Sequence, residues 1–229
     1  MESPLSNFQE VLSCLFLWVS LYHTICIINS SCSYEWNCRI VSTIHAVLIT
    51  ALSYWSAFIV GPWPFVAFGE KNTSLHNLIA SLTLGYFIYD FIWSMYMKTE
   101  GVDMLMHHIV SICGTAYVLY IGLSGPELIA TAFGTEISNP FLQIRWFLRE
   151  TNRYNTLLAK ANDIVFMVLF ISVRLGPGTY VFIGVLKSEK SPFVIKTGGT
   201  ILYFIGWVWA FYIIRFAKKR FVLKCGKTQ

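Results

Sequence analysis

The chain has 229 residues, of which 55% are hydrophobic, 17% are aromatic and only 13% are charged, and its mean hydropathy is +0.58. Because a soluble domain carries about 25% charged residues, this composition excludes an ordinary soluble protein and indicates a surface that mostly faces lipid. The net charge of +5 does not indicate a nucleic-acid partner, because much of it lies in a short basic tail from Lys218 to Lys227 that follows an apolar segment.

A helix needs about 20 apolar residues to cross the hydrocarbon core of a bilayer. Seven segments of the chain qualify or nearly qualify: 11–28, 40–60, 77–97, 104–123, 128–148, 163–183 and 200–217. Pro140 should loosen the fifth segment and free a backbone carbonyl, and Gly176-Pro177-Gly178 should kink or shorten the sixth. We therefore predict an all-α membrane protein with about seven transmembrane helices.

The distribution of basic residues predicts the orientation in the membrane. With seven crossings, the basic stretch from Arg145 to Lys160 and the C-terminal tail lie on one side, which the positive-inside rule assigns to the cytosol. The N-terminus, which is acidic and is interpreted as part of an uncleaved helix, then lies outside. The loop with the glycosylation sequon Asn72-Thr73-Ser74 lies outside as well. The expected location is the endoplasmic reticulum or the plasma membrane.

Two observations bear on this orientation from opposite directions. Cys32 and Cys38 would lie in the cytosol, which argues against a disulfide bond between them. Three lysines would fall on the outer side, against the rule, so a protein with six crossings stays an alternative. They are Lys187, Lys190 and Lys196.

A pair of histidines lies at the start of the fourth segment. His107 and His108 diverge by about 100° around a helix, and Ser111 follows one turn later. A buried imidazole can act as a general base or as a nucleophile near neutral pH. The alternative is that both histidines only hydrogen-bond to neighbouring helices or lie at the headgroup level.

Asp90 lies in the run Gly85-Tyr86-Phe87-Ile88-Tyr89-Asp90 near the end of the third segment. The short connection to the fourth segment predicts that these helices are neighbours, so Asp90 and His108 can meet. A carboxylate that orients an imidazole sets its tautomer and its basicity. A purely structural bond is the alternative, and Tyr86 in the same run is a candidate ligand-binding residue.

The fifth segment carries a polar stripe. Glu136, Asn139 and Gln143 have i, i+3, i+7 spacing and share one helix face, with Thr135 beside them. Lipid cannot satisfy such a face, so it must point into the bundle, where it lines a polar cavity or joins helices by hydrogen bonds. Arg174 in the sixth segment lies at a similar depth, and a buried pair with Glu136 would limit the cost of both charges. Arg174 can alternatively hold a ligand carboxylate or phosphate.

Metal chemistry is not predicted. The five histidines are His23, His45, His76, His107 and His108. They provide neither the spaced clusters of a di-iron hydroxylase nor an evident third ligand for catalytic zinc. We therefore expect no cofactor, and acyl-CoA only as a substrate if the protein is an enzyme.

Three motifs in order resemble the TLC domain, which the ceramide synthases share with the translocation-associated membrane protein and several small lipid-linked proteins. They are the run from Gly85 to Asp90, the run Met104-Leu105-Met106-His107-His108-Ile109-Val110-Ser111, and Glu136-Ile137-Ser138-Asn139-Pro140-Phe141-Leu142 followed by Arg145-Trp146-Phe147. The resemblance implies a six-helix bundle around a polar cavity at residues 35–217. One extra helix would precede it at 1–34, and a basic cytosolic tail would follow at 218–229.

The resemblance also implies candidate chemistry in sphingolipid synthesis. In ceramide synthases an adjacent histidine pair takes part in acyl transfer from acyl-CoA to a sphingoid base, and His107 and His108 match that pair. The synthases then carry a His-Asp-x-x-Asp motif. At the corresponding positions this chain has Thr135, Glu136 and Asn139, so it keeps one carboxylate and lacks the other.

Three functions follow as hypotheses. In the leading one, the protein binds a lipid or an acyl chain and influences membrane lipid composition and homeostasis, as small members of the family are associated with doing. In the second, it is an N-acyltransferase in which His107 or His108 activates the amine or accepts the acyl group, and Asp90 or Glu136 orients it. In the third, it is a membrane chaperone or a structural protein without a lipid substrate.

Overall fold

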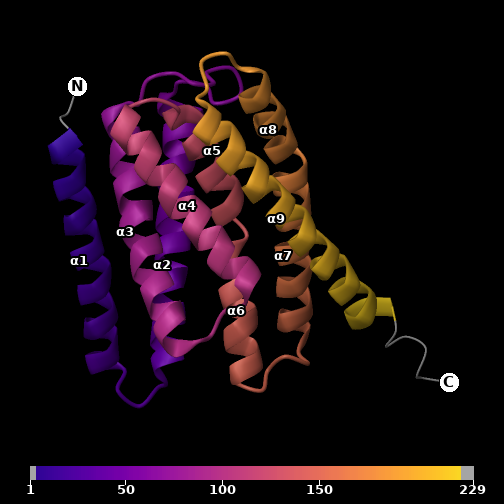
Figure 1. The fold of residues 1–229 in the computed structure, drawn as a ribbon. Coiled ribbons are helices and arrows are strands. Elements are labelled where there is room, and N and C mark those ends of the chain that lie inside the picture. The colour runs from indigo at the N-terminus through magenta and orange to yellow at the C-terminus, as the bar shows by residue number, and fades with distance from the viewer. Residues whose placement is uncertain (1–3, 223–229) are drawn as a thin grey trace.

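The computed structural model describes residues 4–222, which form a bundle of helices (Figure 1). The helices are α1 (Pro4–Ile28), α2 (Tyr34–Tyr54) with the π-helical turn η1 (Trp55–Val60), α3 (Ser74–Met97), α4 (Val102–Ile121), α5 (Gly125–Glu136), α6 (Asn139–Glu150), α7 (Leu157–Leu175), α8 (Pro177–Lys187), and α9 (Phe193–Ala217) with the π-helical turn η2 (Lys218–Val222).

Six helical stretches of the described chain are long and apolar enough to cross a membrane. They are α1, α2 with η1, α3, α4, α7 with α8, and α9 with η2. The shorter helices α5 and α6 follow one another and make the seventh passage, and the N- and C-terminal ends lie at opposite ends of the bundle (Figure 1). The predicted all-α membrane fold is thus confirmed.

Both expected weak points are breaks between helices. Ile137 and Ser138 separate α5 from α6, and Pro140 lies in the first turn of α6. Gly176 separates α7 from α8, which begins at Pro177. Proline has no backbone N–H and blocks the preceding turn, but fits the first turn of a new helix. Local backbone chemistry therefore explains both breaks.

Helix α1 packs at the edge of the bundle against α3 (Figure 1). The two backbones approach closely at Gly85, where a Cβ atom would lie 2.7 Å from the backbone nitrogen of Leu15. Trp18 is buried in this interface and donates its indole N–H to the carbonyl of Leu82 at 3.0 Å. The N-terminal helix is therefore tightly joined to the rest of the bundle.

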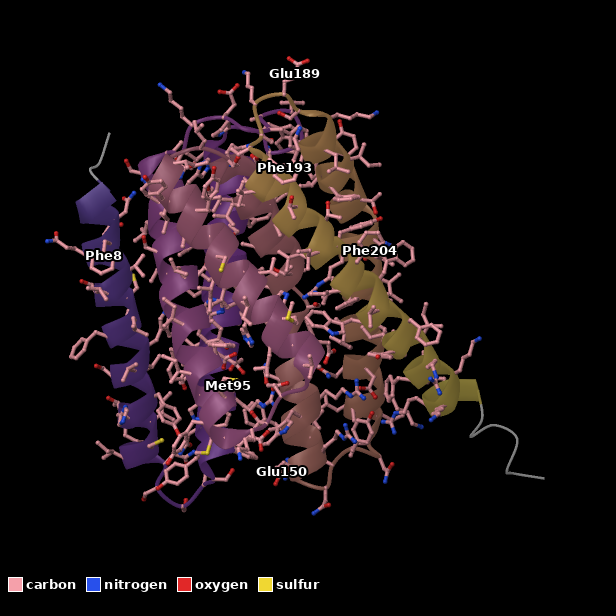
Figure 2. All side chains as sticks on the ribbon, viewed as in Figure 1. Phe8, Met95, Glu150, Glu189, Phe193 and Phe204 are labelled. Atoms are coloured by element: carbon pink, nitrogen blue, oxygen red, sulfur yellow. The ribbon has the colours of Figure 1, made fainter. Side chains whose placement is uncertain are left out.

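Apolar side chains project from the sides of the bundle, and charged side chains gather at its two ends (Figure 2). Phe8 and Phe204 are 59% and 63% exposed on the sides, whereas Glu189 and Glu150 lie at opposite ends. This distribution matches a helical bundle whose belt contacts hydrocarbon and whose ends contact water.

Buried acidic residues join the loops at each end. At one end, Glu127 accepts hydrogen bonds from the backbone N–H of Gly69 at 2.9 Å and from the Ser191 hydroxyl at 3.2 Å. At the other end, Asp163 accepts a bond from Arg220 Nε at 3.0 Å and pairs with Arg145 Nε at 3.6 Å. Each carboxylate connects segments that are far apart in the chain.

The sequon and the basic tail have structural surroundings that the sequence did not indicate. Asn72 Nδ2 donates hydrogen bonds to Asn77 Oδ1 at 3.0 Å and to the Val118 carbonyl at 3.1 Å.

Of the tail expected from residue 218, the turn Lys218–Val222 continues α9, while residues 223–229 lie outside the described residues. Cys32 and Cys38 are both free thiols.

Candidate functional site

A cavity of about 470 Å³ lies within the bundle, enclosed by residues of α3, α4, α5, α7, α8 and α9 together with η1 and the loop after it. Most of its wall is apolar, with aromatic side chains such as Phe58, Phe65, Phe87 and Tyr203. The volume lies within the roughly 300–1,000 Å³ that is typical of sites for one small ligand. Because α9 crosses the bundle obliquely (Figure 1), its middle forms one wall.

Glycines make room for this cavity. Gly114 of α4, with Gly199 and Gly206 of α9, line it, and a Cβ atom added at any of the three would meet no atom within 4 Å. Glycine costs about 1 kcal/mol relative to alanine in a helix interior. The open space is therefore maintained at some expense of helix stability.

The first predicted catalytic residue, His107, lies on the cavity wall. Its ring packs near Trp209, with ring centroids 5.1 Å apart, and near Phe87 at 6.1 Å. Among the described residues no hydrogen bond of His107 and no carboxylate contact is formed. Ser111, one turn further along α4, also lines the cavity. An imidazole and a hydroxyl thus face the same space, without a group that orients the imidazole.

His108 and Asp90 form a separate pair. His108 Nε2 lies 3.0 Å from Asp90 Oδ2, and neither residue lines the cavity. Asp90 Oδ1 also accepts a weak bond from the Cys38 thiol at 3.8 Å. The contact between α3 and α4 that the sequence suggested is therefore present. However, His108 and Asp90 lie away from the cavity that His107 and Glu136 line, because adjacent helical residues point in different directions.

Glu136 lines the cavity, as does Thr135. The Oε2 atom of Glu136 accepts a hydrogen bond from Asn139 Nδ2 at 2.9 Å and lies 3.7 Å from His45 Nδ1. The His45 ring stacks on Tyr86, with ring centroids 3.7 Å apart. Glu136 is therefore held on the side of α2 and α3, and its carboxylate forms part of the cavity wall.

Arg174 lines the same cavity but does not form the expected direct pair with Glu136. Its Nη2 atom donates to the carbonyl of Thr135 at 2.8 Å, a group near the break between α5 and α6. Its guanidinium lies over the rings of Phe170 and Trp209, at 4.4 and 5.6 Å from their centroids. The charge is therefore stabilised by a backbone carbonyl and by aromatic faces.

The remaining predicted ligand-binding residues do not line the cavity. Tyr86, Asn139 and Gln143 are absent from the cavity lining, and the buried Oε1 atom of Gln143 has no hydrogen-bond partner among the described residues. The polar stripe thus divides at the helix break. Glu136 at the end of α5 lines the cavity, whereas Asn139 of α6 donates to Glu136 and Gln143 of α6 is buried outside the cavity lining.

Two residues of the site were not identified from the sequence. His45 is the buried partner of Glu136, and Trp209 covers both His107 and Arg174 while donating its N–H to Asp103 Oδ2 at 2.7 Å. His45 is a lone histidine in an apolar helix, which was the available signal. Among the described residues, no three His, Cys, Asp or Glu side chains gather in a way that could hold a metal ion.

A catalytic histidine needs both access to the ligand and a carboxylate that orients its ring, and in this structure these two features belong to different histidines. His107 has access to the cavity but no orienting carboxylate, whereas His108 has the carboxylate but no access. The cavity does offer an apolar chamber with a few polar groups along one part of its wall, an arrangement typical of a ligand site.

Residues 35–217 match the family model of the TLC domain. The chain belongs to the TLC domain family. It is 30% identical over 149 residues to an uncharacterised TLC domain-containing protein of Schizosaccharomyces pombe, an alignment that covers 64% of this chain but only 49% of the relative. The chain therefore spans about half the length of that relative.

Two further relatives carry the same domain name. TLC domain-containing protein 4 A of Dictyostelium discoideum is 28% identical over 184 residues, which cover 76% of this chain and 69% of the relative. TLC domain-containing protein 1 of Gallus gallus is 28% identical over 153 residues, which cover 64% and 58% of the two chains. The chain is thus a multi-pass membrane protein of the TLC domain family.

Proposed function

We propose that this TLC domain protein binds an acyl chain of a lipid in its intramembrane cavity and thereby influences membrane lipid composition. The observation that carries the proposal is the cavity of about 470 Å³, which has apolar walls and a polar patch at Glu136 and Arg174. Ionisable residues inside a membrane are costly and are functional candidates by default. A cavity of this size suits one acyl chain better than a whole two-chain lipid.

Native mass spectrometry of the detergent-extracted chain tests this proposal. Lipids attached to the outer belt produce a ladder of masses that mild collisional activation removes. We expect one lipid per chain to survive that activation, because its acyl chain lies between helices of the bundle and not on the outer surface. A spectrum in which every lipid leaves together and only the bare chain remains would contradict lipid binding in the cavity and favour a structural or chaperone role.

The presence of His107 on the cavity wall favours a second candidate function, N-acyl transfer from acyl-CoA. In that reaction the imidazole takes a proton from an amine or accepts the acyl group, and coenzyme A leaves. Incubation with acyl-CoA and a panel of lipid amines, sphingoid bases included, tests it. Turnover that disappears in His107→Ala would establish the enzyme, whereas no turnover with lipid still bound leaves binding as the function.

We propose that the protein lies in the endoplasmic reticulum or the plasma membrane. The end of the bundle that carries Asn72 then faces the lumen or the exterior, and the C-terminus lies in the cytosol. The basic stretch from Arg145 to Lys160, which runs from α6 through the connection into the start of α7, supports this orientation. Asn72 is then open to glycosylation only if its two hydrogen bonds break.

Cysteine labelling gives a more direct test of orientation than the sequon does. Glu189 and Glu150 lie at opposite ends of the bundle (Figure 2). We expect an impermeant maleimide to label Glu189→Cys on intact cells, or in lumen-exposed vesicles, and to label Glu150→Cys only after the cytosol is opened. The reversed pattern would overturn the orientation.

Within the family, we propose that the chain is most like TLC domain-containing protein 5, also called transmembrane protein 136. The three motifs at residues 85–90, 104–111 and 136–147 support the family as a whole, and the assignment to this member stays a prediction.

A further inference from the structure

Two opposite charges lie on the cavity wall without touching one another. Glu136 and Arg174 both line the cavity, yet Arg174 takes part in none of the ion pairs that the described residues form. This is unusual for buried charges of opposite sign, which reduce their desolvation cost most by direct pairing. The space between the two groups is therefore the feature that needs a physical explanation.

Each charge has a hydrogen-bond partner of its own, Asn139 for Glu136 and the Thr135 carbonyl for Arg174, and keeps further bonding capacity. Glu136 receives its hydrogen bond through Oε2, from a residue that does not line the cavity, while Oε1 has no hydrogen bond within residues 4–222. Arg174 uses only Nη2, and its Nε atom is buried without a hydrogen-bond partner in the described chain. A guanidinium has five N–H donors and a carboxylate has about four acceptor sites. Both groups can therefore bond to a ligand.

The two charges cancel, which constrains the charge of that ligand. The other carboxylate of the wall, Glu127, lies at the start of α5 and accepts hydrogen bonds from Gly69 and Ser191. The remaining polar groups of the wall, such as His107 and Ser111, are uncharged imidazole and hydroxyl groups. A ligand head with a net charge would add an unbalanced charge to a low-dielectric chamber, which is energetically costly. An uncharged head with an acceptor for Arg174 and a donor for Glu136 satisfies both groups without that cost.

We propose that Glu136 and Arg174 act together as the specificity-determining pair of the cavity and select a single-chain lipid whose head is uncharged and carries both a hydrogen-bond donor and an acceptor. A fatty amide is the simplest example, with its carbonyl toward Arg174 and its N–H toward Glu136. The inference rests on the proposed lipid-binding function and adds the chemical class of the ligand.

Four probes with the same C18 chain test the proposal in nanodiscs, compared at equal mole fractions in the bilayer: oleamide, methyl oleate, oleate and oleylamine. We expect oleamide to displace a diazirine-labelled oleoyl probe at least ten-fold better than the two charged probes and better than methyl oleate, which lacks a donor. If oleate, oleylamine or methyl oleate equals oleamide on the native chain, the proposed selectivity is wrong. If none of the four binds, the lipid-binding function itself is wrong.

Two substitutions make the test specific for the pair. Glu136→Gln leaves the Arg174 end of the wall, away from Glu127, with a net positive charge, so oleate should become the preferred probe. Arg174→Gln leaves it negative, so oleylamine should become preferred. Glu150→Gln, the same acid-to-amide change at an exposed position, should keep the native order. If both cavity variants rank the four probes as the native chain does, the proposal is overturned. If a variant does not fold, the ranking of the probes on the native chain still tests the proposal.

Discussion

Gly114→Phe should reduce binding of a diazirine-labelled oleoyl probe by at least ten-fold, because the ring would occupy space that the acyl chain needs. Gly114 lines the cavity, and a Cβ atom there meets no atom within 4 Å. The substitution therefore adds no clash at its first atom, and replacing a helical glycine raises helix propensity. The fold should survive while the cavity is filled.

The matched control for this change lies two residues away on the same helix. Ala116 is exposed on the outer side of α4, so Ala116→Phe adds the same ring on a lipid-facing surface. We expect it to bind the probe like the native chain, measured by photolabelling yield in nanodiscs at increasing probe mole fraction. Equal binding by both variants would show that the acyl chain lies elsewhere.

Asp163→Asn should destabilise the protein by about 3–5 kcal/mol, the usual cost of removing one partner from a buried ion pair. Asp163 is fully buried between Arg220 Nε at 3.0 Å and Arg145 Nε at 3.6 Å. The amide keeps the shape but removes the negative charge, so two guanidinium groups would face one another without compensation. The helices α6, α7 and α9 would lose the contact that joins their ends.

Unfolding in mixed micelles by titration with sodium dodecyl sulfate measures this loss. Glu150→Gln, an exposed carboxylate at the same end of the bundle (Figure 2), should change the free energy of unfolding by less than about 1 kcal/mol. If Asp163→Asn unfolds at the same detergent fraction as that control, the buried cluster does not stabilise the fold as described.

The course of the chain could be predicted from local chemistry. Bilayer thickness sets the length of a crossing helix, and proline and glycine set the breaks between α5 and α6 and between α7 and α8. The contact between Asp90 and His108 followed from the short connection between α3 and α4. These inferences depend on residues that are close together in the sequence.

Contacts between distant helices could not be predicted in this way. Helical periodicity indicates which residues share a face, but it does not indicate which helix that face meets. The pair of His45 and Glu136 and the position of Trp209 between His107 and Arg174 depend on the packing of α2 and α9. The similar depth of Glu136 and Arg174 in the fifth and sixth segments suggested a direct ion pair, but side-chain geometry keeps the two groups apart on the cavity wall.

Peptide mapping of the photolabelled native chain tests the central claim most directly, that an acyl chain lies inside the bundle. A diazirine near the end of an oleoyl probe reacts with the atoms beside it. We expect adducts on residues of α4, α5 and α9 that line the cavity, at Gly114, Thr131 and Leu202 and their neighbours on the wall. Adducts confined to the outer belt, at residues such as Phe8, Ile92 and Phe204, would contradict it.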